Sequence, residues 1–265
     1  MISSLAGFLR LAAAYLKFNL RAQLAYRGAF LSQVVAMFLN DIVWVTFWWL
    51  FFTRFPVLRG WDVKDVITVW AIAAAGFGIS HGICGNAFSL SSLIVQGQLD
   101  VWMLYPRALL PHLLLGRTNA TAWGDALFGY VIYLVIVRPD PAHFLLFFLL
   151  SISAAMVFLG FNILVGSLAF FLGNSEGLAE QLRFSLITFS TYPSVIFEGP
   201  VKVILFIVIP AMFINNLPIT ALREFSLVHA ALSFLGGVLA VGIGGSVFYY
   251  GLRRYESGNL MNMRG

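Results

Sequence analysis

The sequence predicts an all-α protein that crosses a lipid bilayer six times. Apolar residues make up 60% of its 265 residues and charged residues only 10%. Ordinary globular proteins have roughly 45–50% apolar and about 25% charged residues. The mean hydropathy is +0.90, so the chain has too few polar residues to cover a surface that faces water. The apolar excess must therefore face lipid, and apolar stretches of about 20 residues, the length that spans the hydrocarbon core, recur along the chain.

Residues 1–28 predict an amphipathic helix that lies in the membrane interface. Leu9, Leu16 and Leu20 share one helical stripe, and Arg10 and Lys17 occupy the stripe beside it. Long basic side chains can reach lipid phosphates while their stems stay in the apolar layer. The basic residues are interleaved with leucines and no small-residue cleavage site follows, which argues against a signal peptide.

The rest of the chain, residues 29–265, predicts a single permease-like domain with six spans. We find no second domain, low-complexity tract or internal repeat in it. The predicted spans cover residues 29–52, 66–90, 119–138, 143–172, 182–216 and 227–252.

The fifth span is abnormal because prolines interrupt it. Irregular backbone at membrane depth is tolerated only where protein or a water-filled cavity surrounds it. We therefore expect a span followed by a re-entrant helical hairpin near the far membrane surface, which could serve as a gate. The residues of this expected hairpin and gate are Tyr192, Pro193, Glu198, Pro200, Pro210 and Pro218.

The connection between the second and third spans, residues 91–118, is too polar to cross the bilayer but carries regularly spaced apolar residues. It predicts a short amphipathic helix over its first half that ends at Pro106. If both termini are cytoplasmic, this connection is cytoplasmic too. Ten of the 16 basic residues then lie on the cytoplasmic side, so the positive-inside rule favours this orientation.

The basic residues lie in short segments between the apolar stretches. This distribution of the net charge of +5 indicates contact with anionic lipid headgroups and argues against nucleic acid as a partner. The expected location is the inner (plasma) membrane of a bacterium, as a multi-pass protein.

Several kinds of catalytic site are excluded. A P-loop ends in Gly-Lys-Ser/Thr, but the three lysines follow Leu16, Val63 and Val201. The four histidines are scattered and Cys84 is the single cysteine, so neither a zinc site nor a disulfide is expected. Residues 173–177 match the Gly-x-Ser-x-Gly pattern, but a nucleophile elbow needs a strand-turn-helix and the chain predicts no sheet. We expect no metal and no enzymatic activity on this chain.

Asp41 is the most informative polar residue, because it stands near the middle of the first span. A charge at that depth costs about 2.5–3.5 kcal/mol on insertion scales, so an acid there suggests a functional role. His81 lies at a similar depth in the second span and could be its partner. Three roles remain open for Asp41: a hydrogen bond between helices, a place in a transport path, or proton coupling. Asp125 lies nearer a membrane surface, where we expect it to be solvated or paired with Arg117.

The chain resembles permease subunits of the type-2 ABC exporter superfamily, in the six-span branch whose ATPase is a separate polypeptide. The resemblance rests on short motifs that occur in the expected order over nearly the whole length. They are Tyr26-Arg27 with Phe30-Leu31, Gly97-x-Leu99-Asp100 with Leu104-x-Pro106, Tyr192-Pro193, Ile209-Pro210-Ala211 with Leu217-Pro218, and Arg254-Tyr255-x-Ser257-Gly258.

This resemblance implies two permease protomers, identical or from a paired gene, docked on two ATPase subunits. The chain itself would bind no cofactor, and ATP and Mg would bind to the partner ATPase. The loop between spans two and three would be the coupling helix that contacts the ATPase. Its implied coupling residues are Gln96, Gly97, Gln98, Leu99, Asp100, Met103 and Leu104.

The resemblance also implies a transport path between spans one, two and five of the two protomers. Two other functions stay open: a secondary transporter in which Asp41 and His81 exchange protons, and an intramembrane enzyme that modifies lipids. The expected path residues are Asn40, Asp41, Trp44, Trp48, His81 and Asn86.

Overall fold

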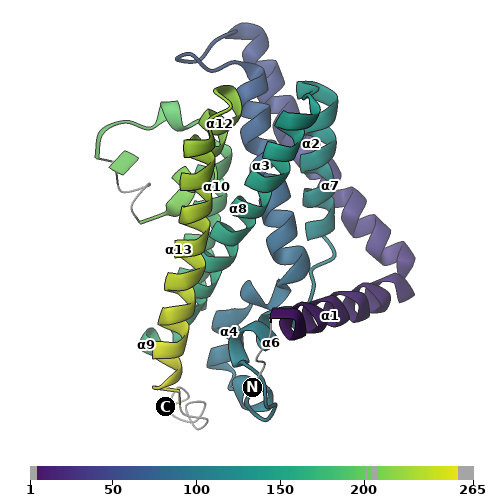
Figure 1. The fold of residues 1–265 in the computed structure, drawn as a ribbon, viewed down its shortest axis with the longest axis vertical. Coiled ribbons are helices and arrows are strands. Elements are labelled where there is room, and N and C mark those ends of the chain that lie inside the picture. Colours follow the sequence, from purple (N-terminus) through teal and green to yellow (C-terminus); the bar gives the residue numbers. More distant parts are fainter. Residues whose placement is uncertain (1–4, 201, 204–207, 256–265) are drawn as a thin grey trace.

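The computed structural model of the chain describes residues 5–200, 202–203 and 208–255, which form helices joined by short loops (Figure 1). Within these residues, extended pairing is limited to one isolated bridge between Leu58 and Trp61. The predicted all-α class is confirmed. Four helical stretches of the described part are long and apolar enough to cross a membrane. They are α2 (Arg27–Arg54), α3 (Val63–Ile83), α8 (Pro141–Ser167) with α9 (Ala169–Leu172), and α13 (Leu227–Leu252).

The other two predicted spans correspond to shorter helices. The third is α7 (Ala122–Ile132), which continues as a π-helical turn, η2 (Tyr133–Val137). The fifth is α10 (Glu176–Thr191). Because neither has the full length of a span, the number of six crossings stays a prediction.

The predicted second span, residues 66–90, is wrong at its C-terminal end. Helix α3 stops at Ile83, and the short turn η1 (Gly85–Ala87) follows. The backbone N–H of Gly85 donates to the carbonyl of Arg117 at 2.8 Å, so the chain leaves the helix to pack against the connection before α7. A Cβ at Gly85 would lie 2.8 Å from that same carbonyl oxygen, and only glycine permits this approach.

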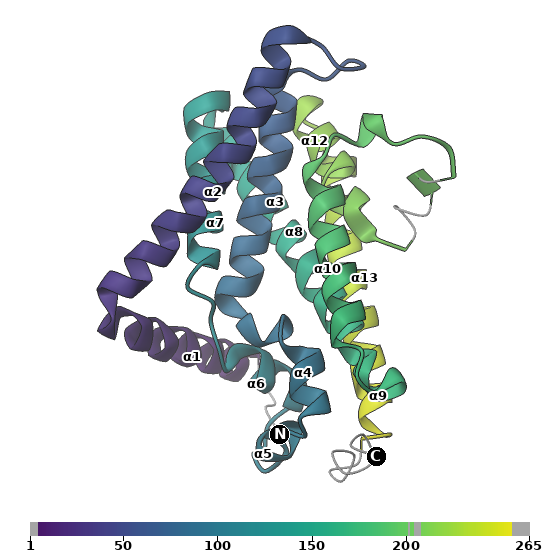
Figure 2. The ribbon, with the colours of Figure 1, turned by 180° about the vertical axis from the view of Figure 1, so that it is seen from behind.

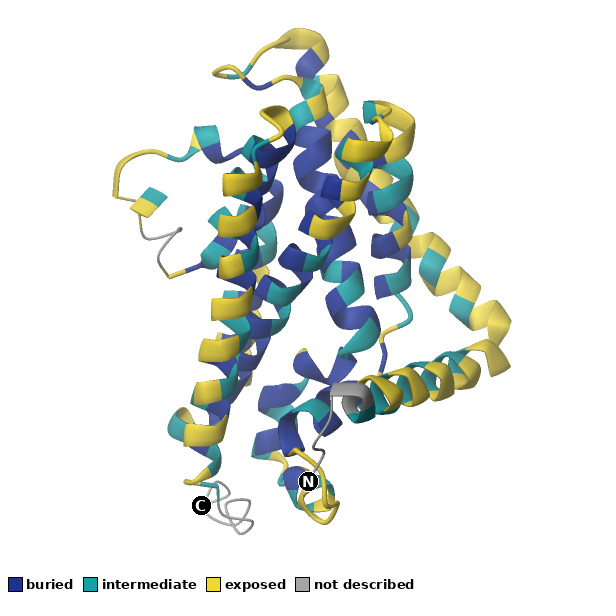
Figure 3. Cartoon of the chain, viewed as in Figure 1, coloured by how far each residue is buried: buried dark blue, intermediate teal, exposed yellow. Residues whose placement is uncertain are grey.

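Helix α3 is the central helix of the bundle. Of its most apolar 18-residue window, 83% is buried, against 17% for α2 and 28% for α13 (Figure 3). Its helical neighbours include α2, α7, α8 and α10. Helices α2 and α13 therefore present most of their surface to the outside of the bundle, whereas α3 is enclosed by protein.

Helices α8 and α13 pack against each other along much of their length. Glycines permit this contact: a Cβ on Gly160 would lie 2.2 Å from the backbone carbon of Ala240, and one on Gly244 would lie 2.3 Å from the oxygen of Gly160. Small residues at a helix interface let two backbones approach closely, and packing of this kind holds helices together in lipid.

Helix α1 (Leu5–Ala25) lies across the foot of the bundle, at a steep angle to α2 (Figures 1 and 2). It is the predicted N-terminal amphipathic helix, and residues 1–4 of that prediction lie outside the described residues. Polar side chains dock it on the connection before α7: Asn19 donates to the carbonyl of Leu115 at 3.1 Å, and Gln23 donates to the carbonyl of Thr118 at 3.0 Å.

The opposite end of the bundle is joined by ion pairs. Helix α12 (Asn216–Arg223) ends with Arg223, which pairs with Asp65 at the start of α3 and donates to the carbonyl of Gly60 at 3.0 Å. Arg59, in the α2–α3 loop, pairs with Glu198. These contacts connect the α2–α3 loop to both ends of the segment that follows α10.

Candidate functional site

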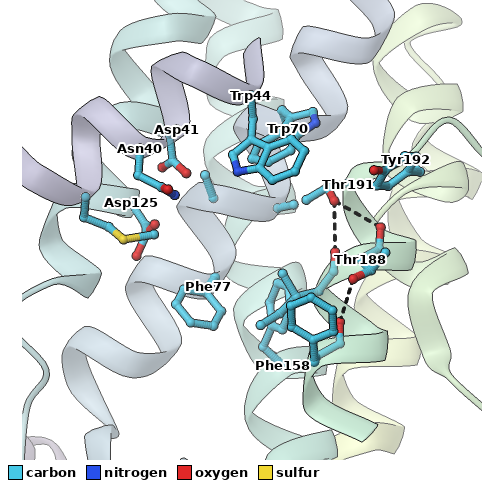
Figure 4. A pocket seen from close by; sticks show the side chains of 15 residues that line it. Asn40, Asp41, Trp44, Trp70, Phe77, Asp125, Phe158, Thr188, Thr191 and Tyr192 are labelled. Atoms are coloured by element: carbon cyan, nitrogen blue, oxygen red, sulfur yellow. Dashed lines mark hydrogen bonds between the residues drawn. The ribbon is translucent and has the colours of Figure 1, made fainter. Parts of the chain in front are cut away.

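A cavity of about 410 Å³ lies at mid-depth in the bundle, between α2, α3, α7, α8 and α10 (Figure 4). Its walls are mostly apolar and aromatic, and its polar groups come mainly from α2, α7 and α10. A cavity of this size at the centre of a membrane bundle is of the kind that holds a small molecule. Its lining residues are Met37, Asn40, Asp41, Trp44, Trp70, Ala73, Ala74, Phe77, Asp125, Phe158, Phe184, Ile187, Thr188, Thr191 and Tyr192.

Two aspartates meet at one side of this cavity. Asp41 on α2 and Asp125 on α7 are each 4% exposed, and their carboxyl groups lie within hydrogen-bonding reach of each other (Figure 4). Helices α2 and α7 approach closely here because Gly124 has no side chain: a Cβ on it would lie 2.5 Å from the carbonyl oxygen of Val34. The glycine beside Asp125 thus brings the two carboxyl groups together.

One oxygen of each carboxyl group has no hydrogen-bond partner among the described residues. Two adjacent carboxylates in a medium of low dielectric constant repel each other. They therefore require a shared proton or a positively charged neighbour. No lysine, arginine or histidine is among the residues that line the cavity, so such a neighbour has to come from outside the lining.

Aromatic rings form the wall next to the aspartates. The ring of Trp44 stacks on that of Trp70, with centroids 6.0 Å apart and an interplanar angle of 19°. Phe77 and Phe158 meet edge to face lower in the cavity, with centroids 5.6 Å apart. Together these rings give the cavity an apolar floor and an aromatic side.

Helix α10 supplies hydroxyl groups that are already satisfied. Thr188 donates to the carbonyl of Phe184 at 2.9 Å, and Thr191 donates to that of Ile187 at 3.1 Å. Their hydroxyl hydrogens are therefore held by their own helix. The two aspartates remain the cavity's charged groups.

The structure places three of the six expected path residues in this cavity: Asn40, Asp41 and Trp44. Trp48, one turn further along α2, is buried in an aromatic cluster and contacts Tyr192 edge to face. Asn86 is buried in the turn after α3, where it donates to the carbonyl of Leu113 at 2.8 Å. These last two side chains support the packing around the bundle and do not line the cavity.

The suggested pairing of Asp41 with His81 is not what the structure shows. The His81 ring stacks on Phe77 at 4.0 Å between centroids, and its Nδ1 lies 3.0 Å from the Phe77 carbonyl oxygen. Its Nε2 lies 3.5 Å from the amide nitrogen of Asn162. The partner of Asp41 is Asp125 instead, because α7 packs between α2 and α3 at this level.

The expectation that Asp125 is solvated or paired with Arg117 is therefore wrong. Helix α7 begins only at Ala122, but its first turn already packs against α2 and α3, so an acid near its start is buried. The sequence carried one signal of this: Asp125 lies between the small residues Gly124 and Ala126, which is typical of a helix face in close contact with other helices.

The expected coupling helix is two helices rather than one. Helix α4 (Leu90–Val95) and helix α5 (Leu99–Met103) are separated at Gly97, whose φ of +70° is a left-handed conformation that ends a helix. Helix α6 (Leu109–Leu115) follows Pro106. The amphipathic stretch thus bends into a compact turn at the foot of the bundle, below α1 (Figure 2).

The exposed tip of this turn is formed by α5 and the residues that follow it. Leu104 is 83% exposed, and Met103 and Tyr105 are also exposed. Leu99 is fully buried and faces the protein, and Asp100 is partly exposed. Of the expected coupling residues, the turn therefore presents Met103 and Leu104 outward together with the polar Gln96 and Gln98.

The C-terminus of α13 supports this turn. Tyr255 lies beside Asp100, and burial together with that carboxylate raises the pKa of the Tyr255 hydroxyl to about 12. Its ring also contacts Phe170 edge to face, with centroids 6.2 Å apart. Tyr255 thus links the exposed turn to the last helix. The neighbouring motif residues Ser257 and Gly258 lie outside the described residues.

The expected gate lies in the segment after α10. The helix ends at Thr191, just before Tyr192-Pro193, and the turn η3 (Ser194–Ile196) follows. Further on, Pro210 opens the turn η4 (Pro210–Phe213), and Pro218 lies in the first turn of α12.

The middle of the expected re-entrant hairpin, residues 201 and 204–207, lies outside the described residues. Its described flanks, which include Glu198 and Pro200, project sideways from the bundle (Figure 1). Glu198 is held there by its ion pair with Arg59.

A comparison with known protein families gives one match that covers most of the chain. The model of a family described as ABC-2 family transporter protein matches residues 38–258. None of the curated proteins and none of the solved structures matches the chain.

Proposed function

Because the chain belongs to the ABC-2 family of transporter proteins, we propose that it is the permease subunit of an ATP-driven ABC exporter, coupled to a separate ATPase subunit. The observation that carries this proposal is the family match over residues 38–258. It includes the exposed turn at the foot of the bundle and every residue that lines the cavity except Met37. ATP and Mg would bind to the partner, because the sequence has no P-loop.

The turn made of α4 and α5 is the surface we assign to the ATPase. Its outward side chains include the apolar Met103 and Leu104 beside the polar Gln96 and Gln98, and Asp100 adds a negative charge at its base. A small exposed apolar surface with a charge beside it is suited to a groove on a partner protein. Because only the short turn η1 separates α4 from α3, a movement of the ATPase against this surface would be transmitted to α3, which lines the cavity.

The substrate would pass through the cavity between α2, α3 and α10. Helix α2 is largely exposed along its length, which leaves room for a second permease protomer, identical or paralogous, against its outer face. The gate would be formed by the segment after α10, with Tyr192 at the cavity and Glu198 at the far end. We place both termini in the cytoplasm and the protein in a bacterial inner membrane, in contact with membrane lipids.

The test is purification of the tagged chain from membranes of its native host in mild detergent, with mass spectrometry and an ATPase assay on the eluate. We expect a stoichiometric soluble protein with a P-loop to co-purify and to hydrolyse ATP. If the chain emerges alone and without ATPase activity, the exporter assignment is wrong, and proton-coupled transport through Asp41 takes its place.

The variant Asp100→Arg makes this test specific for the turn. A reversed charge in an interface should lower the recovered ATPase activity by about tenfold or more. Glu224→Arg, an exposed charge reversal at the opposite end of the bundle, is the matched control and should change nothing. Equal ATPase recovery with Asp100→Arg and with the wild type would show that the ATPase docks elsewhere.

A further inference from the structure

The charged groups that line the cavity are all acidic. Its lining includes the carboxyl groups of Asp41 and Asp125 and no basic side chain. Arg183, which lies on α10 near the cytoplasmic end, stacks over the ring of Phe88 at 4.5 Å and is not among the lining residues. The cavity therefore disfavours anions, and the two carboxyl groups in its wall have no basic partner among the lining residues.

The wall beside the carboxyl groups is also suited to a cation. Trp44 lies one helical turn from Asp41 and presents the face of its indole ring next to the stacked Trp70 (Figure 4). The faces of tryptophan rings attract cations, and the attraction is stronger where water is excluded. Acid and aromatic groups thus occur on the same side of the cavity.

The rest of the cavity requires that the ligand be largely apolar. The hydroxyl groups of Thr188 and Thr191 are bonded to their own helix, and Phe77 and Phe158 form the floor. A small hydrated ion would leave these surfaces without contacts. A cation with a bulky hydrocarbon or aromatic body would cover them and lose little hydration on entry.

The cavity can be reached from the side of the bundle. Asn40 is exposed, and the residues Trp44 and Phe184 are 43% and 64% exposed. These residues lie on α2 and α10, the two helices that flank α3 on this side (Figure 2). An amphiphilic molecule could therefore enter between them.

We propose that this cavity binds an amphiphilic organic cation, held by the carboxyl groups of Asp41 and Asp125 and by the face of Trp44. The proposal rests on the proposed function, because it names the substrate class of the same path. The cation supplies the positive charge that the two adjacent carboxylates require, and when it departs the pair takes up one proton from water to share.

The experiment compares two probes of the same shape and opposite charge. Tetraphenylphosphonium and tetraphenylborate are offered to the purified chain, with whatever ATPase co-purifies, in lipid nanodiscs, and binding to empty discs is subtracted. We expect saturable binding of tetraphenylphosphonium and none of tetraphenylborate. Equal binding of both probes, or saturable binding of neither, would overturn the proposal.

Variants then locate the site. Asp41→Asn combined with Asp125→Asn keeps the shape and the hydrogen-bonding capacity of the pair, and should weaken tetraphenylphosphonium binding about thirtyfold or more. Glu224→Gln, which removes an exposed carboxylate far from the cavity, should bind as the wild type does. If the double variant retains full affinity, the two aspartates form only a structural contact between α2 and α7.

A third variant tests the site even if the double variant does not fold. Trp44→Leu leaves both carboxyl groups in place at a partly exposed position, and should weaken binding of the cation about fivefold by removing the ring face. Unchanged affinity in this variant would remove Trp44 from the site and contradict the proposal.

The outcomes also separate this proposal from the exporter assignment. Charge-selective binding that depends on the aspartates, in a chain that purifies without an ATPase, would overturn the assignment and support the cation site. An ATPase-coupled chain that binds both probes alike would overturn the cation site alone.

Discussion

Several hydroxyl groups buried in this bundle donate a hydrogen bond within one turn of their own helix. Ser167 donates to the carbonyl of Ile163 at 2.6 Å, and Ser233 donates to that of His229 at 2.9 Å. A hydroxyl group can do this at little cost in lipid, but a carboxylate cannot, because it only accepts hydrogen bonds. Asp41 and Asp125 therefore differ in kind from these hydroxyl residues.

At the same scale, a pH-sensitive contact fastens α1 to the foot of the bundle. Tyr15 on α1 is hydrogen-bonded to His112 on α6, which is buried among Trp102 and Tyr105 as well. Burial, and then the positive charge of Arg107, lowers the pKa of His112. The folded chain therefore takes up a proton at this site less readily than the unfolded chain does.

The sign of the resulting pH dependence follows from linkage. The stability that His112 contributes is fully present above its unfolded pKa of about 6.5, and is lost as the pH falls below that value toward the lowered folded pKa. We expect the Tm of the wild type to fall more between pH 7.5 and 5.5 than the Tm of His112→Phe. Differential scanning fluorimetry in detergent measures both, and parallel profiles would contradict this role.

The depth of a residue along its span could be predicted from the sequence, but the residue that it contacts on a neighbouring helix could not. Asp41 was identified because it stands at the centre of an apolar stretch. His81 stands at a similar depth, yet its ring stacks on Phe77, one turn earlier in α3, and lies near Asn162 of α8. Asp125 is nearer an end in sequence but is buried, because α7 meets α2 and α3 from its first turn onward. Which residues meet depends on helix rotation, which one sequence does not reveal.

At the scale of the helices, the close packing of α8 against α13 depends on the absence of a side chain at one position. A Cβ on Gly160 would lie within 2.4 Å of backbone atoms of Ala240 and Val241, which cannot move aside as a flexible side chain can. We expect Gly160→Ala to separate the two helices and to destabilise the protein by about 1–3 kcal/mol. Thermal unfolding in detergent measures the change.

Gly242, on α13, is the matched control. Nothing lies within 4 Å of a Cβ built on it, so Gly242→Ala should leave the Tm unchanged or raise it slightly through the better helix propensity of alanine. An equal decrease of the Tm in the two variants would show that the close contact at Gly160 does not limit stability.

The long helices were well predicted and the short ones were not. The first, fourth and sixth predicted spans agree with α2, with α8 and α9, and with α13 to within a few residues, because apolar length alone defines them. The second span was predicted too long, because the chain after Ile83 turns away to bond the carbonyl of Arg117, which is distant in sequence. The coupling segment was predicted as one helix because its amphipathic pattern continues past Gly97. The structure breaks the helix at that residue.

For the whole molecule, the charge distribution predicts which end faces the cytoplasm. The α2–α3 loop and the α5 turn lie at opposite ends of the bundle (Figure 2). Val57 in the first is 63% exposed and Leu104 in the second is 83% exposed, so both are suitable positions for a label. Cys84 is the single native cysteine and can be replaced by alanine.

We expect a membrane-impermeant maleimide to label Val57→Cys, and not Leu104→Cys, in right-side-out membrane vesicles of the Cys84→Ala chain. Inverted vesicles washed free of the ATPase should give the opposite result, because the positive-inside rule predicts that the α5 turn is cytoplasmic. Labelling of Leu104→Cys in right-side-out vesicles would reverse the orientation and remove the turn from any cytoplasmic ATPase.

The contact between Asp41 and Asp125 also bears on how the chain is made. The ribosome completes α2 before α7 exists, so Asp41 reaches the translocation channel without its neighbour. Its carboxyl group adds about 2.5–3.5 kcal/mol to the cost of leaving that channel for lipid. The many Trp, Phe and Leu residues of α2 offset this cost, and the enclosed α3 also needs the helices that follow it. We expect α2 and α3 to reach their final packing in the bilayer only once α7 has been synthesised.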